Sequence, residues 1–288
     1  MIRNQAIAVR QLTSADRDGL LRLFHTSEYI YHRFALEELG KLLARAPGVA
    51  AFSGTQVRGF LLSHAVVPPC AWIAGFGVTW SEGHRYHQYL DLLLPVLCQE
   101  LHLAGVERLY YSGSDLEFDW LKDALLARHF HMITTLRSYD KTDFSIPTNG
   151  NQQVIVRPFR SSDLDAVLEV EAACFEPHWR YDAAGFLEIQ ATYPYFVVAT
   201  DGERVIGYQF NTVEQGIGYL VRIAVHPDYH SRGIGARLMA EAVRFFASHN
   251  VWKIVLNTEE QNYHAHRLYE WFGFYLVHPR GFVLERAI

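Results

Sequence analysis

The chain has 288 residues, half of them hydrophobic and 14% aromatic, which suffices for two domains with buried cores. It has no run of about 18 apolar residues and no apolar leader, so we expect no membrane partner and a cytoplasmic protein. A net charge of −5 argues against a nucleic-acid partner. The cysteines Cys70, Cys98 and Cys174 are far apart, which predicts free thiols and no metal site.

The two halves of the chain repeat one pattern. Residues 9–16, Val-Arg-Gln-Leu-Thr-Ser-Ala-Asp, correspond to residues 156–163, Val-Arg-Pro-Phe-Arg-Ser-Ser-Asp. In each copy a serine is expected to cap an amphipathic helix: Ser14 in the first copy, and Ser161 or Ser162 in the second. Two further segments, 57–62 and 105–110, correspond to 205–210 and 250–255. Because the displacements are nearly constant, we interpret the chain as a duplicated domain.

A polar, turn-rich segment separates the copies. Residues 142–153 include Pro147 and Gly150 and read as a linker. The expected domains are therefore residues 1–145 and residues 146–288. Helices and strands follow one another in both, which predicts the α/β class with a central mixed sheet flanked by helices in each domain.

The second copy contains the most informative motif of the chain. An apolar strand at 219–225 is stopped by Pro227, and a turn with Gly233 and Gly235 opens a helix. Glycines let a backbone approach a ligand closely, and the N–H groups and dipole at a helix start attract anions. The motif therefore predicts a phosphate site, and more specifically a pyrophosphate site.

A second block follows the first at a fixed separation. A strand at 253–256 leads to a helix at 264–272 and then to a strand at 275–277. This order resembles the GNAT superfamily of acetyl-coenzyme A-dependent N-acetyltransferases over roughly residues 154–286. The residues that carry the resemblance are Val225, Pro227, Arg232, Gly233, Gly235 and Ala236 in the first block and Asn262, Ala265, Leu268, Tyr269, Gly273 and Phe274 in the second.

The resemblance implies acetyl-CoA as cosubstrate and assigns roles to these positions. Tyr269 would be the general acid that protonates the leaving thiolate, unless its ring only packs in the core. Asn262 would bind the pantetheine arm, cap the following helix, or do both. The strand would hold the pantetheine with its backbone at Ile223, Ala224 and Val225. The turn would hold the pyrophosphate at His230, Ser231, Arg232, Gly233, Ile234, Gly235 and Ala236. The family usually has Gln or Arg where this chain has His230, so we expect altered affinity there.

The general base and the acceptor site are less well defined. Family members that acetylate ribosomal-protein N-termini often carry a glutamate at the position of Asn257, which weakens that interpretation here. We select Glu214, near the end of a strand expected to border the cleft, with Glu259, Glu260 or a water chain as alternatives. The aromatic segment 174–181 would contact the acceptor or form a lid.

The first copy lacks the residues that the chemistry needs. Tyr86 and Gln88 stand where Gly233 and Gly235 stand in the second copy, so we expect the first copy not to bind coenzyme A in the usual way. The resulting hypothesis is an N-acetyltransferase whose C-terminal domain moves an acetyl group to a primary amine of a small molecule or peptide by direct attack on the thioester. The alternatives are a non-catalytic acetyl-CoA sensor and a partner-binding module with an aromatic patch made by Trp72, Trp80, Trp120 or Tyr110. The sequence leaves the oligomeric state open.

Overall fold

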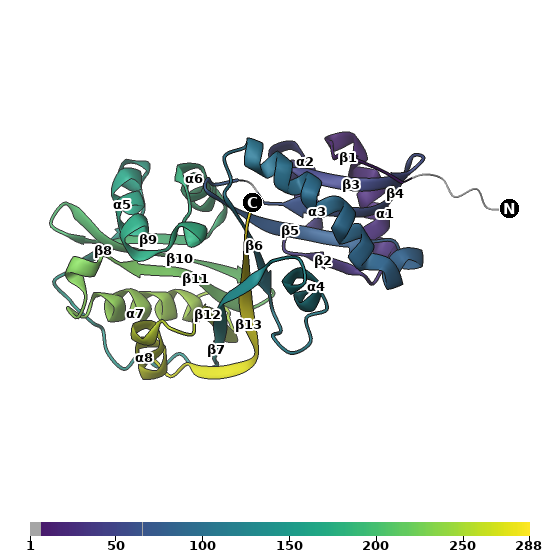
Figure 1. Cartoon of the computed structure of the whole chain (residues 1–288). Coiled ribbons are helices and arrows are strands. Elements are labelled where there is room, and N and C mark those ends of the chain that lie inside the picture. Colours follow the sequence, from purple (N-terminus) through teal and green to yellow (C-terminus); the bar gives the residue numbers. More distant parts are fainter. Residues whose placement is uncertain (1–6, 65) are drawn as a thin grey trace. The chain divides into compact units, whose positions relative to one another are not determined.

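The computed structural model describes residues 7–64 and 66–288, and the chain forms two compact units (Figure 1). The first unit contains the described residues up to Gly113, together with Asp119–Ile133 and Val283–Ile288. The second contains Ser114–Phe118 and Thr134–Phe282. The segment 142–153, expected to link two domains, therefore lies inside the second unit.

The first unit is built on a mixed sheet. Its strands lie in the order β1 (Ile7–Gln11), β3 (Gly48–Ser53), β4 (Gln56–Ser63), β5 (Cys70–Val78), β6 (Arg108–Gly113) and the end of β13 (Tyr275–Ala287). A short strand, β2 (Ile30–His32), pairs with β5 outside this order. The helices of the unit are α1 (Arg17–Thr26), α2 (Leu39–Arg45), α3 (Tyr86–Leu103) and α4 (Lys122–Leu126).

The second unit repeats this plan. Its strands lie in the order β7 (His131–Lys141, from Thr134 on), β12 (Lys253–Glu259), β11 (Ile217–Val225), β10 (Arg204–Glu214), β9 (Tyr195–Asp201) and β8 (Ile155–Pro158), with the beginning of β13 beside β7. Its helices are α5 (Leu164–Cys174), α6 (Ala183–Thr192), α7 (Ile234–Ala247) and α8 (Tyr263–Trp271).

Helices cover both faces of the sheet in the second unit, with α5 and α6 on one face and α7 and α8 on the other (Figure 1). Successive side chains of β10 point to opposite faces of the sheet, so this strand contacts the helices on both faces. Tyr208 and Phe210 pack in the cluster that contains Phe186 of α6. Gln209, between them, points to the opposite face, where its Nε2 donates to the carbonyl oxygen of Leu238 in α7 at 2.9 Å.

The predicted duplication is visible at the level of single ion pairs. In the first unit Arg10 Nη2 lies 2.7 Å from Asp16 Oδ1, and in the second Arg157 Nη2 lies 2.7 Å from Asp163 Oδ1. Both carboxylates also accept a backbone N–H three residues back, from Thr13 and Arg160 respectively. Asp16 and Asp163 therefore close the short turns that precede α1 and α5, and no side chain caps either helix itself. The expected caps, Ser14, Ser161 and Ser162, instead lie in short 3-10 turns that begin at Ser14 and Ser161.

The elements around the glycine turn confirm their predictions with small changes in length. The expected strand at 219–225 begins two residues earlier, and the strand expected at 275–277 extends to Ala287. The length of β13 depends on its pairing with β6 and β7 rather than on its local sequence pattern. Its residues belong to both units. Among the described residues, no helix is both long enough and apolar enough to cross a membrane.

Candidate functional site

Strands β11 and β12 separate in the middle of the second unit. They pair in parallel at only three positions, from Ile217 opposite Lys253 to Tyr219 opposite Val255. On its other side β11 stays paired with β10 as far as Val225, but the register shifts so that Val221 has no partner. An extra residue of this kind is a β-bulge, which bends the strand and increases its twist. The bulge accounts for the divergence of β11 from β12.

The divergence leaves one edge of β11 open. The N–H of His226 donates to the carbonyl oxygen of Ile206, which fixes the hydrogen-bonded positions of the antiparallel ladder. Because these positions alternate, Ala224 faces β10, whereas Ile223 and Val225 present their backbone groups to the open side. Of the three strand residues predicted to hold the pantetheine, Ile223 and Val225 have this orientation. Ala224 does not, so its N–H is engaged in the sheet.

The glycine turn follows directly. Ser231 and Gly233 both have positive φ angles, 60° and 75°, and the helix begins at Ile234. Ser231, Arg232 and Gly233 are exposed residues that precede the positive end of α7. This is the geometry of an anion-binding turn.

The surroundings of Gly233 and Gly235 show what a side chain would contact at each position. A Cβ on Gly233 would lie 3.4 Å from the backbone nitrogen of Asn151, on the side of the preceding segment rather than of a ligand. A Cβ on Gly235 would lie 3.4 Å from a methyl group of Leu268 in α8. Gly233 is therefore favoured for its left-handed backbone, whereas a Cβ at Gly235 would make only an ordinary van der Waals contact with α8.

His230, where the family usually has another residue, turns back toward the strand. Its Nε2 lies 2.8 Å from the carbonyl oxygen of Val225, which can only accept, so this nitrogen carries the proton. The thiol of Cys174 donates to the same oxygen at 3.2 Å. Burial raises the pKa of the Cys174 thiol to about 11, so this thiol stays protonated at neutral pH.

The two candidate residues of the second block, Asn262 and Tyr269, lie at the start of α8 and within it. The side chain of Asn262 caps the helix, since its Oδ1 accepts the N–H of Ala265 at 3.2 Å. Tyr269 is 5% exposed and packs in the core cluster between the sheet and the helices. Burial raises the pKa of Tyr269, which keeps its hydroxyl protonated. No hydrogen bond to this hydroxyl occurs among the described residues.

A histidine–tyrosine pair that the sequence did not reveal lies beside Tyr269. Tyr139 of β7 packs edge-on against the Tyr269 ring, with 5.8 Å between ring centroids. The Tyr139 hydroxyl lies 2.9 Å from Nδ1 of His266, and Nε2 of His266 lies 3.1 Å from the carbonyl oxygen of Glu260. Because that carbonyl can only accept, Nε2 of His266 carries a proton, and Nδ1 and the Tyr139 hydroxyl share the second hydrogen bond. A buried tyrosine on the strand before the linker, 130 residues from Tyr269, gave no local signal.

The candidate carboxylates differ in environment. Glu214 is exposed at the end of β10, opposite Ile217 in the ladder. Glu260 accepts hydrogen bonds from Thr135 and Arg137, and these lower the pKa of its carboxyl. A lowered pKa makes Glu260 a weak base. Glu259 is the last residue of β12 and pairs with Leu136 of β7.

Another missed carboxylate, Glu171 of α5, organises the segment 174–181. Glu171 is 1% exposed and accepts the hydroxyl of Tyr208 and the N–H of Tyr181. Arg222 of β11 approaches it at 3.4 Å and donates to the carbonyl oxygen of Trp179 at 2.8 Å. The Arg222 guanidinium also lies over the rings of Phe175 and Tyr181. Because these contacts occupy Glu171, it holds the segment in place and is not available as a base.

The corresponding opening in the first unit is filled by its own chain. Strands β5 and β6 also pair in parallel at only three positions, from Cys70 opposite Arg108 to Trp72 opposite Tyr110. Beyond them β2 pairs with β5, from Ile30 opposite Gly77 to His32 opposite Gly75. The hydroxyl of Tyr31 then donates to the carbonyl oxygen of Ser112 in β6 at 3.0 Å. The edge that is open in β11 is thus paired in β5.

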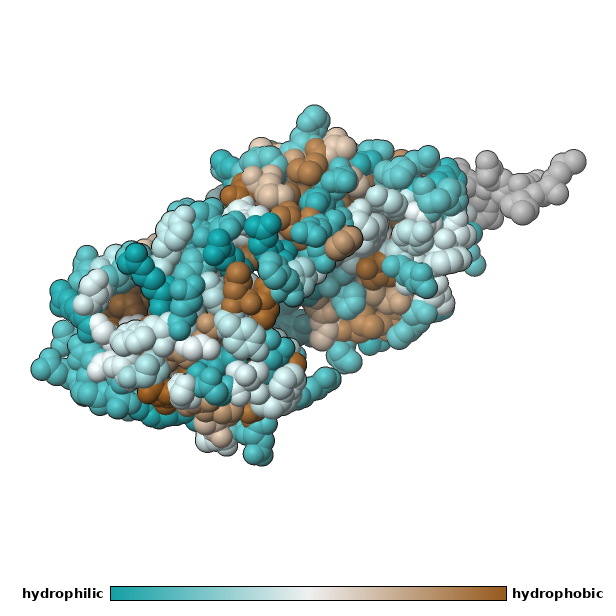
Figure 2. All heavy atoms as spheres, turned by 90° about the horizontal axis from the view of Figure 1, so that it is seen from below, coloured by the Kyte–Doolittle hydropathy of each residue, from teal (hydrophilic) through white to brown (hydrophobic). Residues whose placement is uncertain are grey.

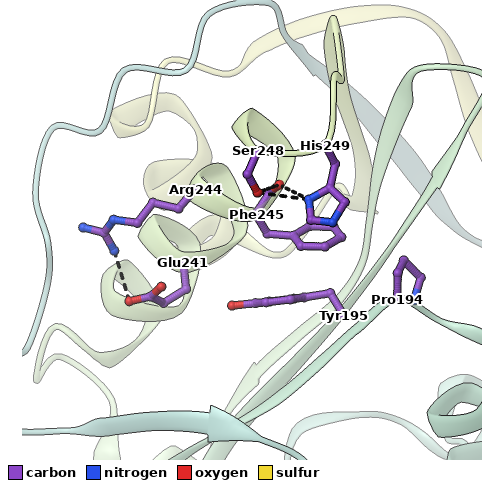
Figure 3. Close-up of a pocket in the computed structure, with 7 residues that line it drawn as sticks. All are labelled: Pro194, Tyr195, Glu241, Arg244, Phe245, Ser248 and His249. Atoms are coloured by element: carbon purple, nitrogen blue, oxygen red, sulfur yellow. Dashed lines mark hydrogen bonds and ion pairs between the residues drawn. The ribbon is translucent and has the colours of Figure 1, made fainter.

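A pocket of about 380 Å³ lies elsewhere on the second unit (Figure 3). The ring of Tyr195 stacks on Phe245 with 4.4 Å between centroids, and His249 lies on the same phenylalanine. Phe245 lies 12 residues after Gly233, which corresponds to roughly 18 Å along a helix. This pocket is therefore separate from the glycine turn.

Comparison with known proteins places the motifs in a wider group. Residues 164–274 match the acetyltransferase (GNAT) family. An uncharacterised N-acetyltransferase of Methanocaldococcus jannaschii is 32% identical over 124 residues, which cover 42% of this chain and 78% of the relative. A mycothiol acetyltransferase of Acidimicrobium ferrooxidans is 28% identical over 137 residues, covering 42% and 44%. A tandem GNAT protein from the clavulanic acid biosynthesis pathway has a similar fold, with a TM-score of 0.65 at 13% identity over 98% of each chain.

Proposed function

Because the chain belongs to the GNAT family of acetyl-CoA-dependent acyltransferases, we propose that its second unit transfers the acetyl group of acetyl-CoA to a primary amine. The acceptor would be a small molecule or a peptide. The observation that carries the proposal is the open edge of β11, which leads directly into the glycine turn. One elongated ligand with a pyrophosphate at one end and amide groups along its length fits this arrangement.

The pantetheine amides would pair with the backbone of Ile223 and with the N–H of Val225, as an added strand does. The carbonyl oxygen of Val225 already accepts from His230 and Cys174. The pyrophosphate would lie on the turn Ser231–Ala236, of which Ser231, Arg232 and Gly233 are exposed, and would benefit from the dipole of α7. Asn262, which caps α8, would face the pantetheine from the other side of the opening. The thioester would then lie near the bulge at Val221, where β11 and β12 diverge.

Acetyl transfer would proceed by direct attack. The neutral amine nitrogen bonds to the thioester carbon, and the carbonyl oxygen takes up negative charge that backbone N–H groups of β11 stabilise. The carbon–sulfur bond then breaks, and the thiolate takes the proton of the Tyr269 hydroxyl. The amine loses its extra proton to a base, so the products are the amide and the free thiol of coenzyme A.

Glu214 would receive the amine proton through water. Val221 lies four residues beyond Ile217, which corresponds to roughly 13 Å along an extended strand. A glutamate side chain does not span that distance, so a short water chain is required. The raised pKa of buried Tyr269 means that its hydroxyl carries the proton that the thiolate would take, and excludes the residue as the base at neutral pH.

The two alternative functions have less support. A non-catalytic sensor would not need the tyrosine that this chain retains at position 269. A partner-binding module would need an exposed aromatic patch, but Tyr110 is buried and only Trp80 of the four candidate aromatics is exposed. On the face in Figure 2 the hydrophobic side chains form several separate patches among polar residues.

The test combines binding with turnover. Calorimetric titration with acetyl-CoA is expected to show binding, and thiol release should depend on an added amine. Suitable probes are a polyamine, an amino sugar, free lysine and a short peptide with a free N-terminus. Binding without amine-dependent thiol release across these probes would favour the sensor, and absence of binding would contradict the proposal.

A further inference from the structure

The segment between β7 and β8 runs alongside α7 (Figure 1). We call residues 148–153 the strap. The N–H of Asn151 donates to the carbonyl oxygen of Gly233 at 3.0 Å, and its side-chain Nδ2 donates to the carbonyl oxygen of Arg232 at 3.0 Å. A single strap residue thus contacts two successive carbonyl groups of the glycine turn, of which that of Gly233 also accepts the N–H of Arg237 in α7 at 3.0 Å.

The fit between the strap and α7 is close. Gly150 has a φ of 63°, and a Cβ on it would lie 2.2 Å from the backbone nitrogen of Arg237 and 2.6 Å from the carbonyl oxygen of Gly233. Gly150 therefore meets both requirements for glycine, a left-handed backbone and direct contact with another main chain. The Oδ1 of Asn151 accepts the N–H of Gln153 at 2.9 Å, which fixes the orientation of the side-chain amide.

These contacts determine where the free N–H groups of the turn point. In a trans peptide the C=O and the following N–H point in opposite directions. Since the strap holds the carbonyls of Arg232 and Gly233, the N–H groups of Gly233 and Ile234 point away from it. We propose that the strap positions the turn for the pyrophosphate of acetyl-CoA, with Asn151 as the positioning residue. This inference rests on the proposed function.

The test compares two ligands that share the acetyl-pantetheine arm. Acetyl-CoA carries the pyrophosphate, and S-acetylpantetheine lacks it. Asn151→Ala is expected to raise the Kd for acetyl-CoA about 3- to 10-fold, the usual effect of one hydrogen bond. The Kd for S-acetylpantetheine should stay unchanged. Gly150→Ala should weaken acetyl-CoA binding further, because its new methyl group displaces the strap.

Asn149→Ala is the matched control. Asn149 belongs to the same strap, but its side-chain Oδ1 accepts a hydrogen bond from Arg244. Arg244 lies about three helical turns along α7 from the glycine turn. The Asn149→Ala variant should bind acetyl-CoA and S-acetylpantetheine as the wild type does. Thermal unfolding verifies that each variant is folded, and Asn151→Ala alone decides the question if Gly150→Ala does not fold.

Three results would overturn the inference, and they differ from one another. Unchanged acetyl-CoA binding by Asn151→Ala would show that the strap does not act on the turn. An equal loss for both ligands would indicate a general structural role. Absence of acetyl-CoA binding by the wild type would contradict the proposed function itself, and the inference with it.

Discussion

Replacement of Tyr269 by phenylalanine separates its proposed catalytic role from its packing. The ring is buried beside Tyr139 and Phe274, and Phe keeps those contacts. Within the described residues of the chain the lost hydroxyl has no hydrogen-bond partner, so its removal should leave the melting temperature unchanged or slightly higher. Loss of a general acid should lower kcat by about 10²-fold, which corresponds to about 2.7 kcal/mol of transition-state stabilisation. The Kd for acetyl-CoA should change less than twofold.

Tyr139→Phe provides the matched control, because it removes a hydroxyl from the neighbouring ring. That hydroxyl binds His266, and its loss leaves a buried ring nitrogen unpaired, which costs about 1–3 kcal/mol. For a protein of this size the melting temperature should fall by about 2–8 °C. The kcat per folded molecule should stay within about threefold of the wild type. If Tyr269→Phe keeps full turnover, or if both variants lose it equally, Tyr269 is not the sole proton donor.

Three further results are expected. Calorimetry should give one acetyl-CoA per chain, because β2 already pairs with the edge of β5 that would bind a second; a stoichiometry of two would contradict this explanation. The Asp163 carboxyl has a pKa held below its ordinary value by hydrogen bonds from Arg157, so its contribution to stability is present above about pH 4 and lost as the pH falls through the lowered pKa. In urea unfolding at pH 7, Asp163→Asn should therefore cost about 1–2 kcal/mol, and the difference from wild type should shrink at pH 3; a pH-independent difference would show that the pair is not the cause. Gly218→Ala should destabilise the second unit by about 1–3 kcal/mol, since its Cβ would lie 2.4 Å from a ring carbon of Phe246, and unchanged urea unfolding would mean that this ring moves freely.

The features of the site that follow from local rules could be predicted from the sequence. A left-handed glycine at the start of a helix, an asparagine cap and an apolar strand all depend on a few neighbouring residues. Gly233, Asn262 and β11 accordingly have the conformations that their motif predicts. The fold class and the family were predicted as well, because two such motifs in a fixed order constrain the topology between them.

The missed features depend on residues far apart in the chain. Tyr139 lies beside Tyr269 only because β7 pairs with β12, and the sequence contains no periodicity that reveals this pairing. Glu171 was not identified from the sequence, because its burial depends on Arg222, which lies on a strand 51 residues away. The linker was predicted from its polar composition alone. Its close contact with Gly233 depends on a backbone fit that composition does not encode.

The duplication shows how one geometry gives two outcomes. In each unit a pair of parallel strands separates after three paired residues, which creates an edge whose backbone groups need partners. In the first unit β2 supplies them within the chain, and Gly83 allows Tyr29 to approach so closely that a Cβ there would lie 2.0 Å from its ring. In the second unit the equivalent segment, 174–181, forms a 3-10 turn at Pro177–Trp179 instead of a strand. It contacts β11 through the side chains of Cys174 and Arg222 and does not pair with the open edge as a strand. The expected loss of cofactor binding in the first copy would therefore need no damage to the fold, because a short strand can satisfy the hydrogen bonds that the pantetheine arm would otherwise make.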